Sequence, residues 1–305
     1  MAAENGPRGE DAANVPVRGG IFPFKGYVID GKYVLDDGIV VGDVATLYRC
    51  RKVENNDAHY ALKMLDDPRT LANEDVLGRF EEESNWLLEF AHHNIIKCTD
   101  CGVWEQGCVR YPYLVMEYVQ GAIPLDIERI PIGLVLEIGE DVASALEYMH
   151  RGSRIHRDIK PENILRSRSG DVTKVIGFGL GRALKKSDRK RKDTEPGVII
   201  GTPNYMPLEQ SMSSREANPK SDVYSLGATV FKLLTGHVPF REMGGDANVI
   251  RAIWSKERIP AAREVDPSVP ENVSDFVYEM TDPEHTKRPD ASEARRAFRE
   301  YRAVA

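Results

Sequence analysis

The sequence lacks a long hydrophobic run. No segment of the 305 residues supplies the roughly eighteen uninterrupted apolar residues of a membrane-spanning helix, and the Gly-, Pro- and Asp-rich N-terminus has no signal-peptide hydrophobic region. We therefore expect no membrane segment in this chain and a cytoplasmic location. A large excess of one charge is also missing, because 41 basic and 48 acidic residues give a formal net charge of -7. This balance argues against general affinity for nucleic acid or anionic membranes.

Cysteine is scarce, with only Cys50, Cys98, Cys101 and Cys108. The Cys98-x-x-Cys101 spacing, with Cys108 beyond it, is a pattern found in zinc sites. Three features oppose a zinc site here: the segment predicts a pair of strands, neighbouring strand residues face opposite sides, and no matching second motif follows. We therefore favour reduced thiols packed in a sheet over a structural zinc ion.

The chain divides into a β-rich part and a helical part. Residues 1–24 are rich in Gly, Ala, Pro and charge without periodicity, which predicts a disordered leader. Side-chain alternation predicts strands at 33–48, with a turn at Asp36-Asp37-Gly38, and at 60–65, 95–103 and 113–119. Helical patterns occur at 73–90, 134–150, 223–234 and 291–301. The 223–234 helix is apolar and expected to be buried, with Asp222 as its cap, and the 291–301 helix is expected to be a charged surface helix. Without internal repeats, this order predicts an α+β fold with a small β-rich lobe followed by a larger helical lobe.

One carboxylate lies where the helical pattern predicts a buried face. Val76, Phe80, Leu87 and Phe90 share a stripe of the 73–90 helix, and Glu83 falls within that stripe. A buried carboxylate is costly unless it meets a cation, and Lys63 on the preceding strand is the natural candidate. The alternative is that Glu83 lies at the edge of the stripe and reaches solvent. Periodicity alone leaves these two interpretations about equal.

The strongest chemical signal is the string His-Arg-Asp-Ile-Lys-Pro-Glu-Asn at residues 156–163. A match of this length and mixed chemistry rarely arises by chance. The string resembles the catalytic loop of protein kinases. Because Lys160 follows Asp158 by two positions, it is similar to the serine/threonine branch of that family. The resemblance covers residues 30–303 and implies a bilobal protein kinase fold, with an antiparallel β-rich N-lobe at 25–119 that carries one key helix and a mainly helical C-lobe at 120–305.

The resemblance implies a role for each polar residue of this loop. Asp158 would be the base that accepts the proton of a substrate hydroxyl, Lys160 would steady the γ-phosphate, and Asn163 would ligate a magnesium ion. Lys63 matches the strand lysine that pairs with the α- and β-phosphates of ATP, and Glu83 matches its helix partner. The resemblance therefore decides the open question in favour of a Lys63–Glu83 ion pair.

The same resemblance implies a nucleotide site and two supporting contacts. Residues that match those around the nucleotide are Gly42, Ala61, the gatekeeper Met116, Glu117 and Val119 of the hinge, and Leu165. Asp222 would anchor the catalytic loop, while Glu209 and Arg288 would form a buried ion pair. The contacts of Asp222 and of the Glu209–Arg288 pair would support the fold and do not indicate whether the chain is active.

The departures from the family cluster around the phosphates. Residues 174–180 read Lys-Val-Ile-Gly-Phe-Gly-Leu, so Gly177 stands where the family has the metal-binding aspartate of Asp-Phe-Gly. The glycine-rich loop aligns with Val-Val-Gly-Asp-Val-Ala at 40–45, where only the middle glycine remains and Asp43 adds negative charge. Asn163 alone would hold magnesium weakly. The resemblance is therefore compatible with ATP binding, with magnesium weak or absent.

The segment after this motif holds the regulatory candidates. Its basic run at 185–192 is most often a solvated mobile loop. The alternative is a docking site for an acidic partner or a phosphate site, in which a phosphate on Thr194 or Ser187 pairs with Arg157. Thr202 belongs to an intact Gly-Thr-Pro string of the same segment.

The chain thus keeps the packing residues of the family while it loses the metal carboxylate. Phe178, with His156 and Leu87, would complete the hydrophobic stack of the active arrangement. This combination is similar to a pseudokinase, which binds nucleotide or protein partners with impaired phosphotransfer. The alternative is an active ATP-dependent serine/threonine kinase with weak or unusual metal dependence. An engineered glycine at 177 is disfavoured, because one change would suffice and the glycine-rich loop differs as well. The strings at 205–210 and 221–227 look more like bacterial kinases than animal ones.

Overall fold

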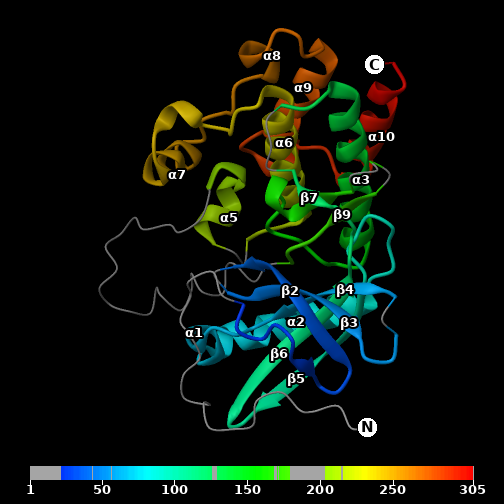
Figure 1. The fold of residues 1–305 in the computed structure, drawn as a ribbon. Coiled ribbons are helices and arrows are strands. Elements are labelled where there is room, and N and C mark those ends of the chain that lie inside the picture. Colours follow the sequence, from blue (N-terminus) through cyan, green and yellow to red (C-terminus); the bar gives the residue numbers. More distant parts are fainter. Residues whose placement is uncertain are drawn as a thin grey trace, which may run out of the picture. The chain divides into compact units, whose positions relative to one another are not determined.

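The computed structural model describes residues 22–42, 44–55, 57–125, 129–167, 170, 172–178, 203–213 and 216–304 (Figure 1). The backbone divides into two compact units. Unit 1 contains the described parts of Met1–Ala91 and Ile96–Tyr118, and unit 2 those of His92–Ile95, Val119–Gly179 and Asp193–Ala305. The predicted leader up to residue 21 and the basic run at 185–192 lie outside the described residues.

Unit 1 is built on a six-stranded sheet with the strand order β1-β2-β3-β4-β6-β5. All neighbouring strands of this sheet run antiparallel, as predicted. The strands are β1 (Val28–Ile29), β2 (Tyr33–Val41), β3 (Thr46–Lys52), β4 (His59–Met64), β5 (Cys98–Gln106) and β6 (Val109–Glu117). The strand predicted to start at Ile95 therefore starts later. Ile95 instead forms an isolated parallel bridge with Val175 within unit 2, and its backbone N–H donates to the carbonyl of His92.

The turn predicted at Asp36-Asp37-Gly38 is wrong. Strand β2 runs through these residues, and its pairing with β3 shifts register on either side of Asp37 and Gly38. Such bulges absorb extra residues without ending a strand. Both carboxylates meet cations of β3, since Arg51 lies 2.7 Å from Asp36 and Arg49 lies 2.8 Å from Asp37. Cross-strand ion pairs therefore stabilise a segment whose composition alone favours a turn.

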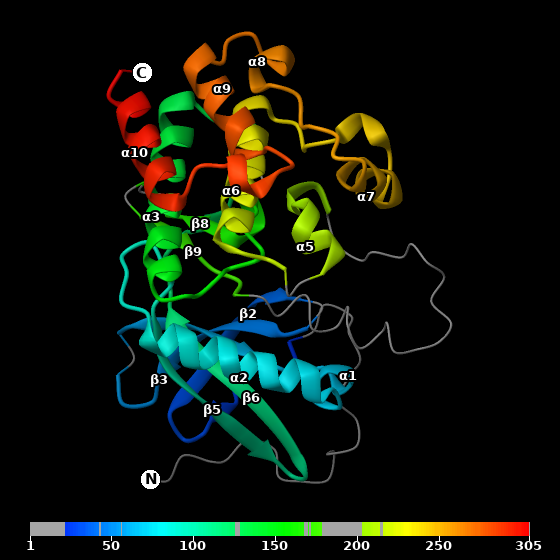
Figure 2. The ribbon, with the colours of Figure 1, turned by 180° about the vertical axis from the view of Figure 1, so that it is seen from behind.

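Helix α2 (Glu74–Glu89) packs against the sheet of unit 1 and follows the short helix α1 (Pro68–Leu71) (Figure 2). Asn73 caps it, because its side-chain oxygen accepts hydrogen bonds from the first backbone N–H groups of the helix. Val76, Phe80 and Leu87 are buried, as the periodicity predicts. The same stripe carries Glu83 into the interior of this unit.

Unit 2 is mainly helical. Its helices are α3 (Ile132–Arg151), α5 (Leu208–Met212), α6 (Pro219–Thr235), α7 (Asp246–Trp254), α8 (Ala262–Val265), α9 (Glu271–Met280) and α10 (Ala291–Arg302), with short 3-10 turns that include η1 (Pro161–Asn163). A small sheet in the order β7-β8-β9 joins β7 (Ile123–Pro124), β8 (Ile164–Arg166) and β9 (Thr173–Val175). In the part of the chain that the structure describes, no helix is long and apolar enough to cross a bilayer.

The central helix α6 is almost entirely buried, as its apolar sequence predicts. Its cap is not Asp222 but Asn218, whose side chain takes part in a capping box with Ser221. Pro219 occupies the first turn, where a missing N–H costs nothing. Asp222 lies one position beyond Ser221, inside the helix, and is free to serve another segment.

The last helix, α10, packs along α3 (Figure 2). Its buried residues include Ala294 and Phe298, while the other face is charged as predicted. Arg299 donates to Glu140 of α3 over 2.8 Å, and Arg295 donates to Glu147 over 3.0 Å. The predicted surface helix is thus amphipathic and is fastened to unit 2 on one side.

Candidate active site

Unit 1 contains the predicted pair of Lys63 and Glu83. Lys63 Nζ lies 2.9 Å from Glu83 Oε1 and 3.2 Å from Oε2. The Glu83 side chain is 2% exposed and that of Lys63 is 20% exposed. Glu83 therefore does not reach solvent, and the buried interpretation of its stripe is confirmed. The ammonium sits 6.0 Å from the ring centroid of Phe80, which limits its access to water.

The remaining unit 1 candidates lie on β4, β6 and the β2–β3 connection. Ala61 of β4 pairs in register with Met116 of β6, and both are buried. Glu117 ends β6, where its carboxylate accepts a hydrogen bond from the Lys97 backbone N–H over 2.8 Å. Gly42 donates its N–H to the Ala45 carbonyl over 3.0 Å, and a Cβ at Gly42 would lie 2.9 Å from that oxygen. This tight turn requires glycine for its own geometry.

Unit 2 brings together the three catalytic candidates. Asn163 donates from Nδ2 to the Asp158 carbonyl over 2.7 Å and to Asp158 Oδ2 over 2.8 Å. Lys160 Nζ lies 3.3 Å from the same carboxylate oxygen. The 3-10 turn η1 produces this arrangement, because it folds Asn163 back over the residue five positions earlier. Asp158 is therefore a partly exposed carboxylate held by an amide and an ammonium.

Asp222 anchors the catalytic loop from inside α6. Its Oδ1 accepts from the Arg157 backbone N–H over 2.8 Å, and its Oδ2 accepts from His156 N over 2.9 Å and from His150 Nε2 over 2.8 Å. Burial by itself raises the pKa of Asp222, but the hydrogen bond and charge of His150 lower it below its ordinary value. The carboxylate holds Arg157 at φ +69, a left-handed conformation that costs free energy in a non-glycine residue.

The segment around Gly177 is fastened to the same loop. His156 Nε2 donates to the Ile176 carbonyl over 3.0 Å, and the His156 and Phe178 rings lie 4.7 Å apart between centroids. The predicted contact between Phe178 and His156 is therefore present within unit 2. Gly177 itself has φ +79 and contributes no side-chain oxygen. Thr194, Thr202 and Asp43 lie outside the described residues.

Two other unit 2 candidates lie on neighbouring segments. Leu165 is the central residue of β8 and pairs with Lys174 of β9. Val119 accepts a hydrogen bond at its carbonyl from Ala122 N over 3.1 Å. Both residues belong to unit 2.

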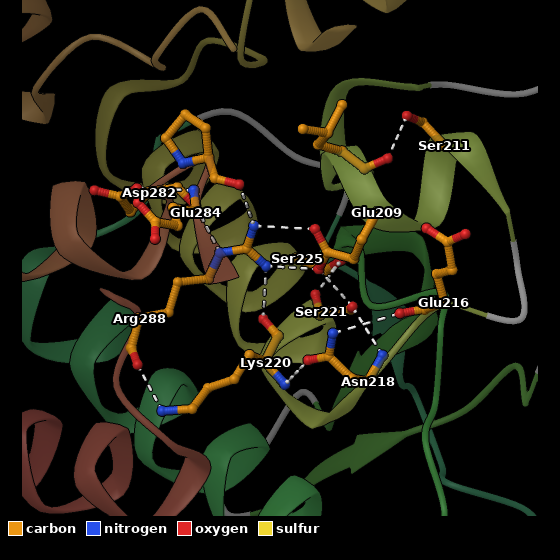
Figure 3. A network of polar contacts seen from close by, with 12 residues as sticks. Glu209, Ser211, Glu216, Asn218, Lys220, Ser221, Ser225, Asp282, Glu284 and Arg288 are labelled. Atoms are coloured by element: carbon orange, nitrogen blue, oxygen red, sulfur yellow. Dashed lines mark hydrogen bonds and ion pairs between the residues drawn. The ribbon is translucent and has the colours of Figure 1, made fainter. Parts of the chain in front are cut away.

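The predicted ion pair of Glu209 and Arg288 is present and buried (Figure 3). Arg288 donates to both carboxylate oxygens over 2.8 and 3.2 Å, and Ser221 donates to Glu209 Oε1 over 2.6 Å. Burial raises the pKa of Glu209, but the hydrogen bonds and charge of Arg288, with the bond from Ser221, lower it below its ordinary value. The pair joins α5 to the start of α6 and to the segment before α10.

Sequence reasoning missed Gln210. Its Nε2 donates over 3.1 Å to the carbonyl of Arg157, the residue with left-handed backbone, and its side chain is buried. Gln210 therefore links α5 to the catalytic loop. The sequence signal for this contact is weak, because a glutamine after a buried glutamate is equally compatible with the surface. The Asn218 cap carried a clearer signal, since Asn-Pro followed by a serine at the third helical position is a helix-start pattern.

Comparisons with known proteins agree with this fold. The model of the protein kinase domain family matches residues 33–297. The serine/threonine-protein kinase PknL of Mycobacterium tuberculosis is 36% identical over 260 residues, which are 84% of this chain and 61% of PknL. The probable serine/threonine-protein kinase PknB of Lactococcus lactis is 31% identical over 262 residues, which are 84% of this chain and 39% of that protein. This chain therefore spans about three fifths or less of the length of these relatives.

The structural comparison supports the same class. The crystal structure of Rad53 1-466 in complex with AMP-PNP matches with a TM-score of 0.67 at 22% identity, covering 87% of this chain and 64% of that one. At that identity the match concerns the fold alone. The two units thus form an α+β protein kinase fold, with an antiparallel β-rich N-terminal part and a mainly helical C-terminal part. The chain belongs to the protein kinase domain family, in the serine/threonine branch of its bacterial relatives.

Proposed function

We propose that this chain is a serine/threonine protein kinase-like domain that binds nucleotide and protein partners and transfers phosphate poorly, as a pseudokinase does. The observation that carries the proposal is Gly177, which supplies no carboxylate beside the Asp158–Asn163 hydrogen bonds. In the proposed boundaries the N-lobe spans 25–119 and the C-lobe 120–305, within a kinase domain of 30–303.

Nucleotide binding is supported by the cations that remain. Glu83 holds the Lys63 ammonium at 2.9 Å, which fixes its position for a phosphate. Lys160 is a second ammonium on the catalytic loop, at 3.3 Å from Asp158. The proposed nucleotide contacts are Gly42, Ala61, Glu117, Val119 and Leu165. None of these groups depends on a side chain at 177.

The magnesium ions of the family do not fit the residues around Gly177. Magnesium prefers oxygen ligands in near-octahedral geometry, and active kinases supply a carboxylate from this position. Here Gly177 supplies no side-chain oxygen, and a Cβ at that position would lie only 2.7 Å from Asn163 Cγ. Among the described residues, no group of three or more His, Cys, Asp or Glu could hold a metal ion.

The alternative function is an active kinase with weak or unusual metal dependence. The observation that favours it is the retained contact between Asp158 and its neighbours, because a carboxylate held by Asn163 at 2.8 Å is oriented to accept the proton of a hydroxyl group. Metal ions stabilise the transferring phosphoryl group by several kcal/mol, so their loss slows transfer by about a hundredfold or more. The rate of phosphate transfer therefore distinguishes the pseudokinase from the active kinase.

The test combines binding and transfer. Calorimetry measures ATP binding in EDTA and in magnesium chloride, and radiolabel transfer from ATP to a serine-rich protein measures activity. We expect binding in both buffers, little transfer, and loss of binding in Lys63→Met. The matched control is Lys287→Met, which removes an exposed lysine from a surface pair with Glu284 and should leave binding unchanged. Robust magnesium-dependent transfer that Asp158→Asn abolishes would instead establish the active kinase.

The regulatory assignments remain predictions. Phosphate on Thr194 would pair with Arg157, and Thr202 and Phe178 would respond to the state of the same segment. Phosphopeptide mass spectrometry of the protein from its native cell tests the first assignment, and an unmodified Thr194 under all conditions would contradict it.

A further inference from the structure

Asn163 is fixed in place by both its backbone and its side chain. Its backbone N–H donates to the Lys160 carbonyl over 2.9 Å, and its carbonyl accepts from Ile176 N over 2.9 Å. The two hydrogens of Nδ2 serve the carbonyl and the carboxylate of Asp158, over 2.7 and 2.8 Å. The amide therefore has one orientation, with Nδ2 committed to Asp158 and Oδ1 left for another direction.

That direction is the space beside Gly177. A Cβ built on Gly177 would lie 2.7 Å from Asn163 Cγ and 3.0 Å from Nδ2, and closer still to Oδ1. These three atoms of Asn163 are the nearest neighbours of that position. Non-bonded carbon atoms pack best at about 3.5–4.0 Å, so no side chain at 177 fits while Asn163 keeps this orientation. The Asn163 amide occupies the volume that a Cβ at position 177 would need.

We infer that Gly177 and Asn163 are a matched pair, in which the missing side chain at 177 makes room for the Asn163 amide and so preserves its hydrogen bonds to Asp158. Lys160, at 3.3 Å from Asp158 Oδ2, supplies positive charge on the same oxygen that Asn163 binds. The carboxylate is thus oriented and partly neutralised by the chain itself.

The pairing also predicts the result of restoring the family residue. In Gly177→Asp the new Cβ displaces the Asn163 amide, which breaks its hydrogen bonds to Asp158 before any metal site can form. This single reversion therefore does not restore magnesium-dependent transfer. The inference rests on the proposed function in one respect only, since both take position 177 to supply no magnesium ligand.

The test is a double-mutant cycle measured by urea unfolding of the full chain. Gly177→Ala adds one methyl group, and Asn163→Ala removes the amide with which it would collide. We expect the fold-change in the unfolding equilibrium constant caused by Gly177→Ala to be at least about fivefold smaller when Asn163 is already alanine. The matched control is Gly170→Ala. Gly170 has φ +78 against +79 for Gly177, but the nearest atom to its Cβ is Arg166 Nη2 at 3.8 Å.

The control separates backbone strain from collision. Gly170→Ala introduces the same left-handed strain without the overlap, so its effect should be equal with and without Asn163. A Gly177→Ala effect that is also equal in both backgrounds would overturn the pairing. If Gly177→Ala does not fold, an NMR measurement on the wild-type chain tests the pairing instead. This measurement should show a nuclear Overhauser contact between the Gly177 α-hydrogens and the Asn163 side-chain amide hydrogens, and the lack of that contact would overturn the pairing.

The outcomes for the pairing and for the proposed function are distinct. A wild-type chain that phosphorylates efficiently with magnesium, yet shows the coupling of Gly177 and Asn163, refutes the proposed function and leaves the two residues paired. Independent effects of the two substitutions in an inactive chain refute the pairing and leave the proposed function standing.

Discussion

Replacing Arg288 by alanine should be among the most damaging single substitutions in unit 2. The Arg288 side chain is fully buried, and besides Glu209 it donates to the carbonyls of Asp282, over 2.6 Å, and Lys220, over 3.0 Å (Figure 3). Its guanidinium also lies 4.9 Å from the ring centroid of Tyr224. Arg288→Ala leaves the Glu209 carboxylate buried without its cation, and removing one partner of a buried ion pair costs about 3–5 kcal/mol.

Urea unfolding at neutral pH measures this cost. A loss of that size lowers the melting temperature by on the order of 10 °C in a domain of this size. The control is Arg263→Ala, which breaks a pair with Glu271 over 3.3 Å whose side chains are 51% and 78% exposed. Exposed pairs contribute about 0–1 kcal/mol. Equal losses in Arg288→Ala and Arg263→Ala would refute the reasoning, because burial would then have no influence on the cost.

The same pair makes a signed prediction about pH. The folded-state pKa of Glu209 lies below its ordinary value of 4.5, because Arg288 and Ser221 together outweigh the opposing effect of burial. A lowered folded-state pKa gives stability that is fully present above the unfolded-state value and is lost as pH falls through the folded-state value. Glu209→Gln should therefore be less stable than wild type at pH 7, with a difference that shrinks in acid. A constant difference across that range would contradict the assignment.

Two further predictions concern the anchor and the thiols. The two carboxylate oxygens of Asp222 accept hydrogen bonds from the backbone amides of His156 and Arg157 and from the His150 side chain, whereas Asp222→Asn offers only one acceptor oxygen. Hydrogen exchange at the two backbone amides, measured by mass spectrometry, should therefore be faster in this variant. Unchanged exchange would count against the anchor. Burial raises the pKa of the Cys50 thiol to about 12, whereas Cys108 is exposed. Iodoacetamide at pH 8 should therefore modify Cys108 and leave Cys50 unmodified. Labelling of both thiols at the same rate would contradict the packing of Cys50.

Local patterns in the sequence were sufficient for much of the fold. The apolar run at 223–234 predicted a buried helix, and α6 contains it. The stripe that includes Glu83 left burial and exposure about equal, and the resemblance to the kinase family favoured the ion pair with Lys63, which is present. Asp158 and Asn163 are only five residues apart, so a single turn brings them together. The buried helix and the contact between Asp158 and Asn163 depend on neighbours within a few residues, which the order of the chain records directly.

Where local preference conflicted with distant contacts, the sequence alone misled. Asp36-Asp37-Gly38 has the composition of a turn, but arginines of the next strand hold it in β2. Asp222 has the chemistry of a helix cap, but its oxygens face the catalytic loop, about 65 residues earlier in the chain. The alternation and composition of a segment do not predict which hydrogen-bond donor or cation will bind it, because that group comes from another element of the fold.

Position 177 shows the boundary between the two kinds of information. The sequence by itself determined that no carboxylate stands there, and with the motif at 156–163 it determined the family. Only the tertiary structure decided what fills the space, since Gly177 and Asn163 approach within a distance that excludes even one methyl group. Repulsion between atoms changes over tenths of an ångström, and the folded backbone sets distances on that scale, whereas the order of residues does not.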